Sequence, residues 1–226
     1  MALWSGRFEK GVSEFTQEFG ASLPVDKAMY HQDIAGSRAH ARMLAAQGVI
    51  SQEDADAIVA GLSDIEKTIE EGNFVFDIND EDIHMSIEKV LTQNIGDAGA
   101  RLHTGRSRND QVITDTRLYA EDLMHDVNSL RQALIKAAKD NMGTILPGYT
   151  HMQHAQPVLL SHHFMAYFWM FSRDFARLKQ AYDAANANPL GSAALAGTTY
   201  PLDRAKTTEE LGFATMIPNS LDAVSD

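Results

Sequence analysis

Two polar segments of this 226-residue chain hold residue types that can bind and transform a carboxylate-bearing molecule. Residues 103–111 read His-Thr-Gly-Arg-Ser-Arg-Asn-Asp-Gln and lie where a long run without glycine or proline begins. Guanidinium groups, a hydroxyl, an amide and free backbone N–H groups at a helix N-terminus form a site for a carboxylate or a phosphate. Alternatively, Ser107 or Asn109 merely caps the helix while Arg106 and Arg108 are solvated. Spacing alone leaves both interpretations open.

The second polar segment, residues 148–157, reads Gly-Tyr-Thr-His-Met-Gln-His-Ala-Gln-Pro. His151 lies in a short polar connection between two predicted long helices, where a helical bundle can hold an active-site loop. Because the ordinary pKa of histidine is about 6.5, His151 can act as a general acid or base near neutral pH. A lone histidine more often caps a helix or packs through a hydrogen bond. His154, His162 and His163 suggest a metal site, but no acidic ligand or complete ligand set accompanies them, which argues against one.

Other polar groups have simpler explanations by sequence alone. Residues 80–84, Asp-Glu-Asp-Ile-His, could form a polar corner of an active site, but acidic residues are also favoured in the first turn of any helix. Ser22, Asn219 and Ser220 have the types of ordinary loop residues. The chain has no cysteine, which excludes disulfides and thiol nucleophiles, and it has neither a glycine-rich phosphate loop nor a dinucleotide fingerprint.

The composition is that of a soluble globular protein, with 44% hydrophobic and 22% charged residues. A net charge of −12 opposes general affinity for nucleic acid or anionic membranes. The N-terminal residues have no apolar core typical of a signal peptide, and the most apolar stretch, 157–171, is too short and too polar to span a bilayer. We therefore predict a cytoplasmic protein with neither nucleic acid nor membrane as a partner.

Helical patterns dominate the first half of the chain. Ser51 and Asp54 form a capping-box pattern that opens a helix running towards Glu71 and stopping at Gly72. A second helix is predicted to begin near residue 79 or 80 and to end at Gly96. The only β-like run is 73–78, so we expect little or no sheet.

Two long helices are predicted in the second half. Residues 107–141 contain no glycine or proline and carry apolar residues at alternating steps of four and three. A second long helix is predicted from Pro157, as a first-turn proline, to about residue 187. Its aromatic run, 167–171, is expected to be core. Such long helices favour an extended bundle and oligomerisation. We place the domain boundary so that 1–106 form a short-helix domain and 107–226 the first part of a bundle.

Taken together and in order, several segments resemble the argininosuccinate lyase family. The segments are LWSGRF (3–8), DEDIH (80–84), TGRSRNDQ (104–111), GYTHMQHAQP (148–157) and PLGSAALAGT (189–198). The resemblance covers essentially the whole chain. Its arginine-rich segment separates it from fumarases, aspartases and adenylosuccinate lyases, which carry other residues there.

The resemblance implies an all-α fold of the fumarase/aspartase kind, with a long central helical bundle. It also implies a homotetramer whose active sites combine segments of three subunits. The implied reaction is the reversible trans β-elimination of argininosuccinate to arginine and fumarate in arginine biosynthesis. It requires no metal and no organic cofactor.

The same resemblance assigns residues of this chain to the site. His151 corresponds to the family's acid–base histidine, beside Thr150, which contacts the substrate. Asn109 and Ser22 correspond to substrate-binding residues. Further positions that line the site, with less defined roles, are Arg106, Ser107, Arg108 and His84. The family assigns proton abstraction to a serine on a flexible loop, so the direction of proton transfer by His151 stays open.

The chain departs from the family pattern in one large respect. The family's Gly-Ser-Ser-x-Met-Pro-x-Lys-x-Asn loop does not occur in it, so we expect the N-terminal half of a lyase, inactive by itself. Smaller departures are Ser5 and Ala193 for the usual glycines and His154 for a usual basic residue. Two alternatives remain: a structural, crystallin-like protein on the same scaffold, and a helical module that binds an anion without transforming it.

Overall fold

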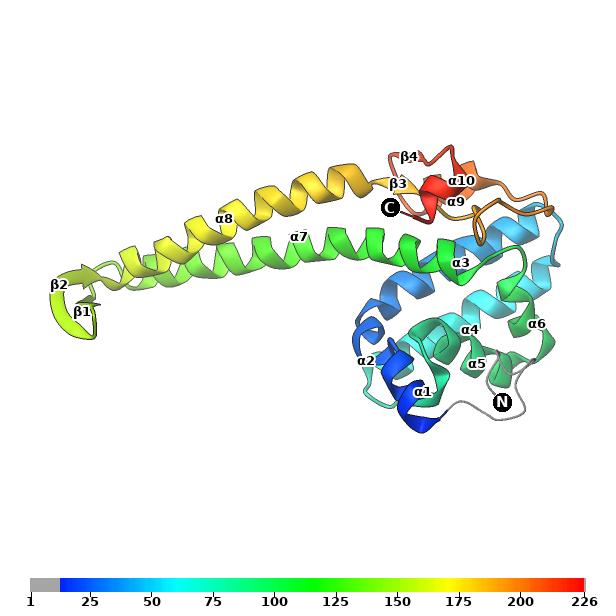
Figure 1. Ribbon diagram of the computed structural model, residues 1–226, viewed down its shortest axis with the longest axis horizontal. Coiled ribbons are helices and arrows are strands. Elements are labelled where there is room, and N and C mark those ends of the chain that lie inside the picture. Colours follow the sequence, from blue (N-terminus) through cyan, green and yellow to red (C-terminus); the bar gives the residue numbers. More distant parts are fainter. Residues whose placement is uncertain (1–12, 226) are drawn as a thin grey trace. The chain divides into compact units, whose positions relative to one another are not determined.

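The computed structural model describes residues 13–225 and is mostly helical, which confirms the predicted fold class (Figure 1). The chain groups into two compact units. The first unit comprises the described residues up to 116 together with those from 187 onwards, and the second unit comprises 117–186. The boundary between residues 106 and 107, as a boundary of domains, stays a prediction.

The first unit is built from short and medium helices. Its α-helices are α1 (Glu14–Gly20), α2 (Leu23–Asp26), α3 (Tyr30–Ala46), α4 (Gln52–Glu70), α5 (Ile83–Ile95), α6 (Asp97–Ala100), the start of α7 (Arg108–Asp140), α9 (Arg204–Glu210) and α10 (Ser220–Ala223). Single 3-10 turns are η2 (Lys27–Met29), η3 (Ile78–Asp80) and η4 (Arg101–His103), and strands β3 (Ala187–Asn188) and β4 (Thr215–Met216) pair in parallel. Helices α3, α4 and α5 pack on one another around fully buried Ile34, Ile58 and Leu91 (Figure 1). This core is the rigid base of the region described below.

The predicted start of α4 is confirmed by a side-chain cap. The Ser51 hydroxyl accepts a hydrogen bond from the Asp54 backbone N–H at 3.0 Å, which satisfies a free donor at the start of α4. The Asp82 carboxylate does the same for the N–H of Met85, at 2.7 Å, at the start of α5. Helix α5 begins at residue 83 rather than at 79 or 80 because residues 78–80 form the separate turn η3.

The predicted long helix beginning at residue 107 is confirmed as α7. Ser107 precedes it and forms a reciprocal cap: its hydroxyl accepts from the N–H of Asn109 at 3.3 Å, and its own N–H donates to Asp110 at 2.9 Å. This S-x-x-D pattern satisfies donors on both sides of the helix start. The cap fixes the backbone direction of the arginine-rich segment.

The second unit is a helical hairpin closed by two strands. It contains α7 beyond residue 116, the strands β1 (Ile145–Thr150) and β2 (Gln153–Leu159), and α8 (Leu160–Ala185). Arg131 of α7 donates to the Ser172 hydroxyl of α8 at 3.1 Å and stacks over Phe168 and Phe175. Arg117, near the start of α7, donates to the carbonyl of Ala185, the last residue of α8, at 2.9 Å. The two helices therefore run antiparallel (Figure 1).

The β-like run 73–78 agrees with the expectation of little sheet, whereas the predicted helix start at Pro157 was wrong. Residues 73–77 form no strand, and Phe74 and Phe76 pack against the core of the first unit. Residues 145–159 form an antiparallel hairpin, so Pro157 lies in β2 opposite Pro147 and α8 begins only at Leu160. Proline is tolerated there because a two-stranded ribbon consists of edge strands, which leave some N–H groups unpaired in any case.

The aromatic run of α8 is not core within this chain. None of the residues of α8, all of which the structure describes, is buried. Tyr167 is 43% exposed and Trp169 is 61% exposed. In addition, none of the described helices is long and apolar enough to cross a membrane.

Candidate functional site

A cavity of about 1060 Å³ opens in the first unit beside the N-terminus of α7. Three segments form its walls: the turn into α5 with its first two turns, residues 103–109, and the loop at 193–198. The lining residues are Glu81, Asp82, Met85, Glu88, His103, Gly105, Arg106, Ser107, Arg108, Asn109 and Ala193 to Thr198. Four of the predicted site residues, Arg106 to Asn109, thus line a single cavity.

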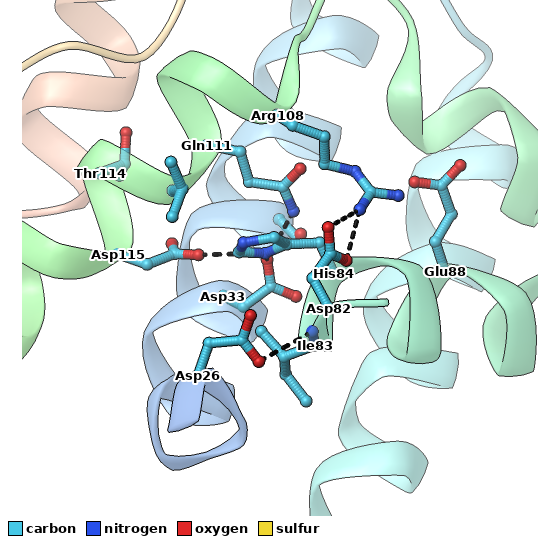
Figure 2. Close-up of polar contacts among 12 residues, drawn as sticks. Asp26, Asp33, Asp82, Ile83, His84, Glu88, Arg108, Gln111, Thr114 and Asp115 are labelled. Carbon is cyan, nitrogen blue, oxygen red and sulfur yellow. Dashed lines mark hydrogen bonds and ion pairs between the residues drawn. The ribbon is translucent and has the colours of Figure 1, made fainter. Parts of the chain in front are cut away.

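Arg108 is held in the cavity wall by an ion pair with Asp82. Nη1 of Arg108 donates to both carboxylate oxygens of Asp82, the residue that also caps α5 (Figure 2). The Nε of Arg108 is buried and has no hydrogen-bond partner among the described residues. Because Asp82 is tied both to the α5 backbone and to Arg108, it couples the starts of α5 and α7.

Arg106 lies deeper than Arg108 and is only 7% exposed. Its Nη1 donates to the Ser37 hydroxyl of α3 at 2.9 Å, while its Nε is buried without a partner in the described part of the chain. Burying the positive charge of Arg106 costs free energy, and the negative charges of the neighbouring carboxylates offset this cost. The positive charge of Arg106 lowers the pKa of Asp33 and also that of Glu88, in each case together with a nearby histidine.

Asn109 and Asp110 attach the loop at 193–198 to the start of α7. The Asn109 side-chain amide donates to the carbonyl of Ala194 at 2.8 Å. One carboxylate oxygen of Asp110 bonds to the N–H of Ser107, and the other accepts hydrogen bonds from the N–H groups of Gly191 and Ala193, at 2.9 and 2.8 Å. The fully buried carboxylate of Asp110 thus holds the wall of the cavity in place. In the structure, the Asn109 amide is directed to this loop.

Behind the cavity wall, His84 lies between two buried carboxylates. Its Nδ1 is 2.8 Å from an oxygen of Asp33 and 3.4 Å from an oxygen of Asp115, and Gln111 donates to Asp33 at 2.5 Å (Figure 2). His84 is 3% exposed and does not line the cavity. The structure therefore places His84 behind the wall rather than in the lining that Arg106 to Asn109 form.

The pKa values of the two carboxyl groups in this cluster are shifted in opposite directions. Burial and the negative charge of Asp33 raise the pKa of Asp115 well above its ordinary value. Burial also acts to raise the pKa of Asp33, but the charges and hydrogen bonds of His84, Arg106 and Gln111 outweigh it and lower that pKa to about 2. Asp33 is thus the more acidic member of the pair, and Asp115 keeps its proton to a higher pH than an ordinary aspartate.

Two clusters in the described part of the chain bring three potential metal ligands within 4.8 Å of one another. One is the buried set Asp33, His84 and Asp115, and the other is the more exposed set His31, Glu66 and Glu70. In each, the histidine already contacts a carboxylate, at 2.8 and 3.0 Å. Hydrogen bonding and ion pairing account for both arrangements as they stand.

Ser22 lies next to the cavity rather than in its lining. Its hydroxyl donates to Asp26 at 2.5 Å, and its N–H donates to the carbonyl of Glu81 at 2.9 Å. Glu81 has φ of +69°, and the following N–H, of Asp82, bonds to the carbonyl of Asp80 at 2.8 Å. This γ-turn is a strained conformation for a residue other than glycine. The segment carrying Ser22 therefore supports the strained turn that leads into the wall.

Thr150 and His151 belong to the second unit, at the tip of the β1–β2 hairpin. Thr150 pairs with Gln153, so His151 and Met152 form a two-residue loop, with φ of +50° and +60°. Both loop residues are exposed. Two positive φ values are typical of a type I′ turn, whose twist matches that of the strands. The hairpin thus presents the imidazole at its outermost point.

Sequence reasoning missed three residues of the site. Asp110 carried a signal, since it stands three positions after Ser107 and completes a capping pattern. His103 stands first in the polar segment 103–111, but Glu88 carried no signal, because their contact at 3.0 Å depends on how α6 and η4 return the chain to α5.

Similarity to known proteins identifies the family of the chain. A family model described as "Lyase" matches residues 6–226. The chain belongs to this lyase family. The argininosuccinate lyase of Symbiobacterium thermophilum is 53% identical over 228 residues, covering 99% of this chain and 50% of that protein. The argininosuccinate lyase of Acetivibrio thermocellus is also 53% identical, with 100% and 50% covered. The chain thus spans about half the length of the curated relatives it matches.

Solved structures agree with the fold. An EDDS lyase in complex with formate is 29% identical with a TM-score of 0.60, covering 95% of this chain and 44% of that one. A structure titled fumarate lyase:delta crystallin, from Brucella melitensis and bound to cobalt, has a TM-score of 0.63 over 96% of this lyase-family chain and 52% of its own. At 18% identity, the second likeness shows the fold alone.

Proposed function

We propose that this lyase-family chain is the N-terminal half of an argininosuccinate lyase, which cleaves argininosuccinate reversibly to arginine and fumarate in arginine biosynthesis. The observation that carries the proposal is the cavity at the start of α7. There, Arg106, Ser107, Arg108 and Asn109 lie together opposite a Gly-Ala-rich loop, in a chain 53% identical to named argininosuccinate lyases.

The chemistry explains why such residues are needed. Elimination begins with loss of a proton next to a carboxylate, and the resulting carbanion spreads its charge into that carboxylate. Fixed donors that meet this charge in a site shielded from water lower the barrier more than mobile water can. Such donors are proposed to come, in the first unit, from the N-terminus of α7, from two guanidinium groups and from the Asn109 amide, which in the structure donates to the carbonyl of Ala194. Ser22, beside the Glu81 turn, is proposed to contact the substrate from the edge of the cavity.

His151 is proposed as the acid–base residue, with Thr150 beside it as a substrate contact. Because His151 lies at an exposed hairpin tip, water can be excluded from it only when a further protein surface covers the tip. In a homotetramer with shared active sites, the hairpin of one copy serves a cavity formed by others. The unburied aromatic residues of α8 support this assembly, because large apolar side chains with no cover in one chain mark a protein interface.

His84 has a different proposed role. Because it is buried between Asp33 and Asp115, it orients the start of α7 rather than contacting the substrate. No metal or organic cofactor is required by the proposed reaction, and the proposed location is the cytoplasm.

The test uses the complete polypeptide that contains these residues. His151→Asn should reduce the rate of fumarate release at least a hundredfold, because general acid–base catalysis contributes at least about that much. Its circular dichroism and melting temperature should stay those of the unmodified protein. His154→Asn is the matched control, since His154 lies on the same hairpin and bonds to the Tyr149 hydroxyl. Turnover that survives in His151→Asn would remove the assigned role. Binding of argininosuccinate without any turnover in the unmodified protein would favour an anion-binding module instead.

A further inference from the structure

The lining of the cavity contains an imidazole, that of His103, which the predicted set of site residues does not include. His103 is the last residue of η4, the turn that follows α6, and lines the cavity together with Glu88 of α5. Nδ1 of His103 lies 3.0 Å from a carboxylate oxygen of Glu88, and the two side chains are 35% and 26% exposed. A carboxylate at Nδ1 fixes both the ring orientation and the position of one proton. The other ring nitrogen, Nε2, has no hydrogen-bond partner in the described part of the chain.

Glu88 is suited to this positioning role. Burial acts to raise its pKa, but the hydrogen bond and charge of His103, followed by the charges of Arg106 and Arg108, lower it below the ordinary value. Glu88 therefore stays ionised under conditions in which a free glutamate begins to accept a proton. With the carboxylate of Glu88 at Nδ1, Nε2 is the ring nitrogen left for a ligand, and it is a donor when the ring holds both protons.

The position of His103 relative to the arginines decides what it can bind. It stands three residues before Arg106 in the same cavity wall, and the guanidinium of Arg108 is already committed to Asp82. A molecule with two carboxylates needs donors at two places. The start of α7 supplies one group of donors, and Nε2 of His103 supplies another.

We propose that His103 is a substrate-binding residue whose Nε2 donates a hydrogen bond to a carboxylate of a dicarboxylate ligand, and that Glu88 is the positioning residue that orients it. This inference rests on the proposed function for the identity of the ligand, fumarate or the succinyl part of argininosuccinate. It goes beyond that function because it adds a dyad outside the predicted site.

Variants of His103 separate binding from structure. His103→Asn keeps a donor at the place of Nδ1, facing Glu88, but removes the donor at Nε2. His103→Gln places an amide N–H close to the former Nε2 and loses the charge. We expect His103→Asn to weaken fumarate binding about tenfold or more, since a hydrogen bond to a charged group is lost, and His103→Gln to restore part of that loss. Glu88→Gln should weaken binding by roughly three- to tenfold.

A matched control exists in the same unit. His31 contacts Glu66 through Nδ1 at the same distance, 3.0 Å, on helices α3 and α4, and neither residue lines the cavity. His31→Asn should change the melting temperature about as much as His103→Asn while leaving fumarate affinity unchanged. A purely structural ion pair at His103 and Glu88 would make the two variants alike in both measurements.

The experiment measures fumarate affinity by calorimetry and argininosuccinate turnover by absorbance, in the complete polypeptide. Unchanged fumarate affinity in His103→Asn, with turnover intact in the unmodified protein, overturns the dyad and leaves the proposed function standing. Fumarate binding that depends on His103 without argininosuccinate turnover overturns the proposed function and supports the dyad. Absence of fumarate binding to the unmodified protein overturns both.

Discussion

The two units of this chain differ in how far they bury their apolar side chains. The first unit covers its apolar residues with its own helices and even encloses a network of charges, with His84 and Asp115 almost fully buried. In the second unit few side chains are buried, such as Ala138 of α7, while no residue of α8 is buried and Trp169 lies largely in solvent. The first unit therefore forms the wall of the cavity within its own fold, whereas the second exposes apolar side chains of α8 and, at its hairpin tip, His151.

This difference bears on catalysis. A preorganised anion site needs rigid donors, and the first unit fixes its donors by caps and buried ion pairs. Under the proposed function, His151 acts in a cavity of another copy and must be exposed, as it is at the hairpin tip. Each prediction below changes one side of this comparison.

The largest effect is expected at the buried charge cluster. Asp33→Asn removes the more acidic member and leaves His84 and Arg106 without their main countercharge, so unfolding free energy should fall by about 3–5 kcal/mol. Asp115→Asn is the matched control, because the raised pKa of Asp115 makes it the carboxyl that loses its proton less readily, and a neutral amide there should destabilise the protein much less than Asp33→Asn. Urea denaturation of both variants measures the difference. Equal losses would contradict the assignment of Asp33 as the more acidic member.

The pH dependence of stability follows from the same pair. The pKa of Asp33 is lowered from 3.8 to about 2, so its contribution, roughly 2 kcal/mol, is present above pH 3.8 and is lost as pH falls towards 2. The raised pKa of Asp115 acts in the opposite sense: its contribution is complete below 3.8 and is lost as pH rises through the raised value. Asp115→Asn should therefore show a flatter stability profile on the alkaline side than the unmodified protein. A profile that is unchanged in this variant would count against the raised pKa.

The next effect compares apolar residues of the two units. Ile58→Ala, in the core of the first unit, should cost about 2–4 kcal/mol at any protein concentration, because the cavity it leaves cannot fill. Trp169→Ala should cost less than about 0.5 kcal/mol wherever the chain is dissociated, and more as protein concentration rises and copies associate. Melting temperatures over a range of concentrations, with sedimentation to follow assembly, test this. A concentration-independent loss in Trp169→Ala would show that its contacts lie within one chain.

The same contrast explains which parts of the molecule the sequence could predict. Helix starts such as Ser51 and Ser107 depend on residues three apart, so α4 and α7 were located to within a residue or two. The hairpin at 145–159 was missed because its strands are stabilised only by each other, and Pro157 has the same sequence signal at a helix start as in an edge strand. The exposure of α8 could not be predicted, because an apolar stripe looks alike whether it faces its own chain or another.

The candidate site shows the same limit. Arg106 to Asn109 form one contiguous segment, so their joint placement follows from the sequence. Glu88 and His103 meet only because Gly99 lets α6 pack against α5: a Cβ at Gly99 would lie 2.8 Å from the Cα of Thr92. Which two backbone segments approach so closely depends on tertiary packing, so the contact between Glu88 and His103 could not be predicted from the sequence.

A smaller effect is expected in the wall of the cavity. Ala193 has φ of +54°, and its N–H is held by Asp110, so it occupies a left-handed conformation in which glycine suffers no strain. Ala193→Gly, which restores the residue typical of the family, should raise unfolding free energy by about 1 kcal/mol, or the melting temperature by about 2–4 °C. Ala196→Gly, in the same loop and without positive φ, should lower it by a few tenths of a kcal/mol. A fall in stability for both variants would show that the loop relaxes in solution.

The smallest effect is expected at the tip of the second unit. Met152 has φ of +60° and is 92% exposed, so its side chain contributes little packing to offset the strain of the turn. Met152→Gly should stabilise the hairpin by about 0.5 kcal/mol, since relief of strain exceeds the added freedom of the unfolded chain by only a small margin. Met142→Gly, an exposed methionine without positive φ in the same connection, should instead be slightly destabilising. If Met152→Gly also left turnover unchanged in the complete polypeptide, the turn would matter only for placing His151. A large loss of turnover without a loss of stability would mean that the strained loop itself tunes the imidazole, and the contrast between a rigid first unit and a merely exposed second unit would need revision.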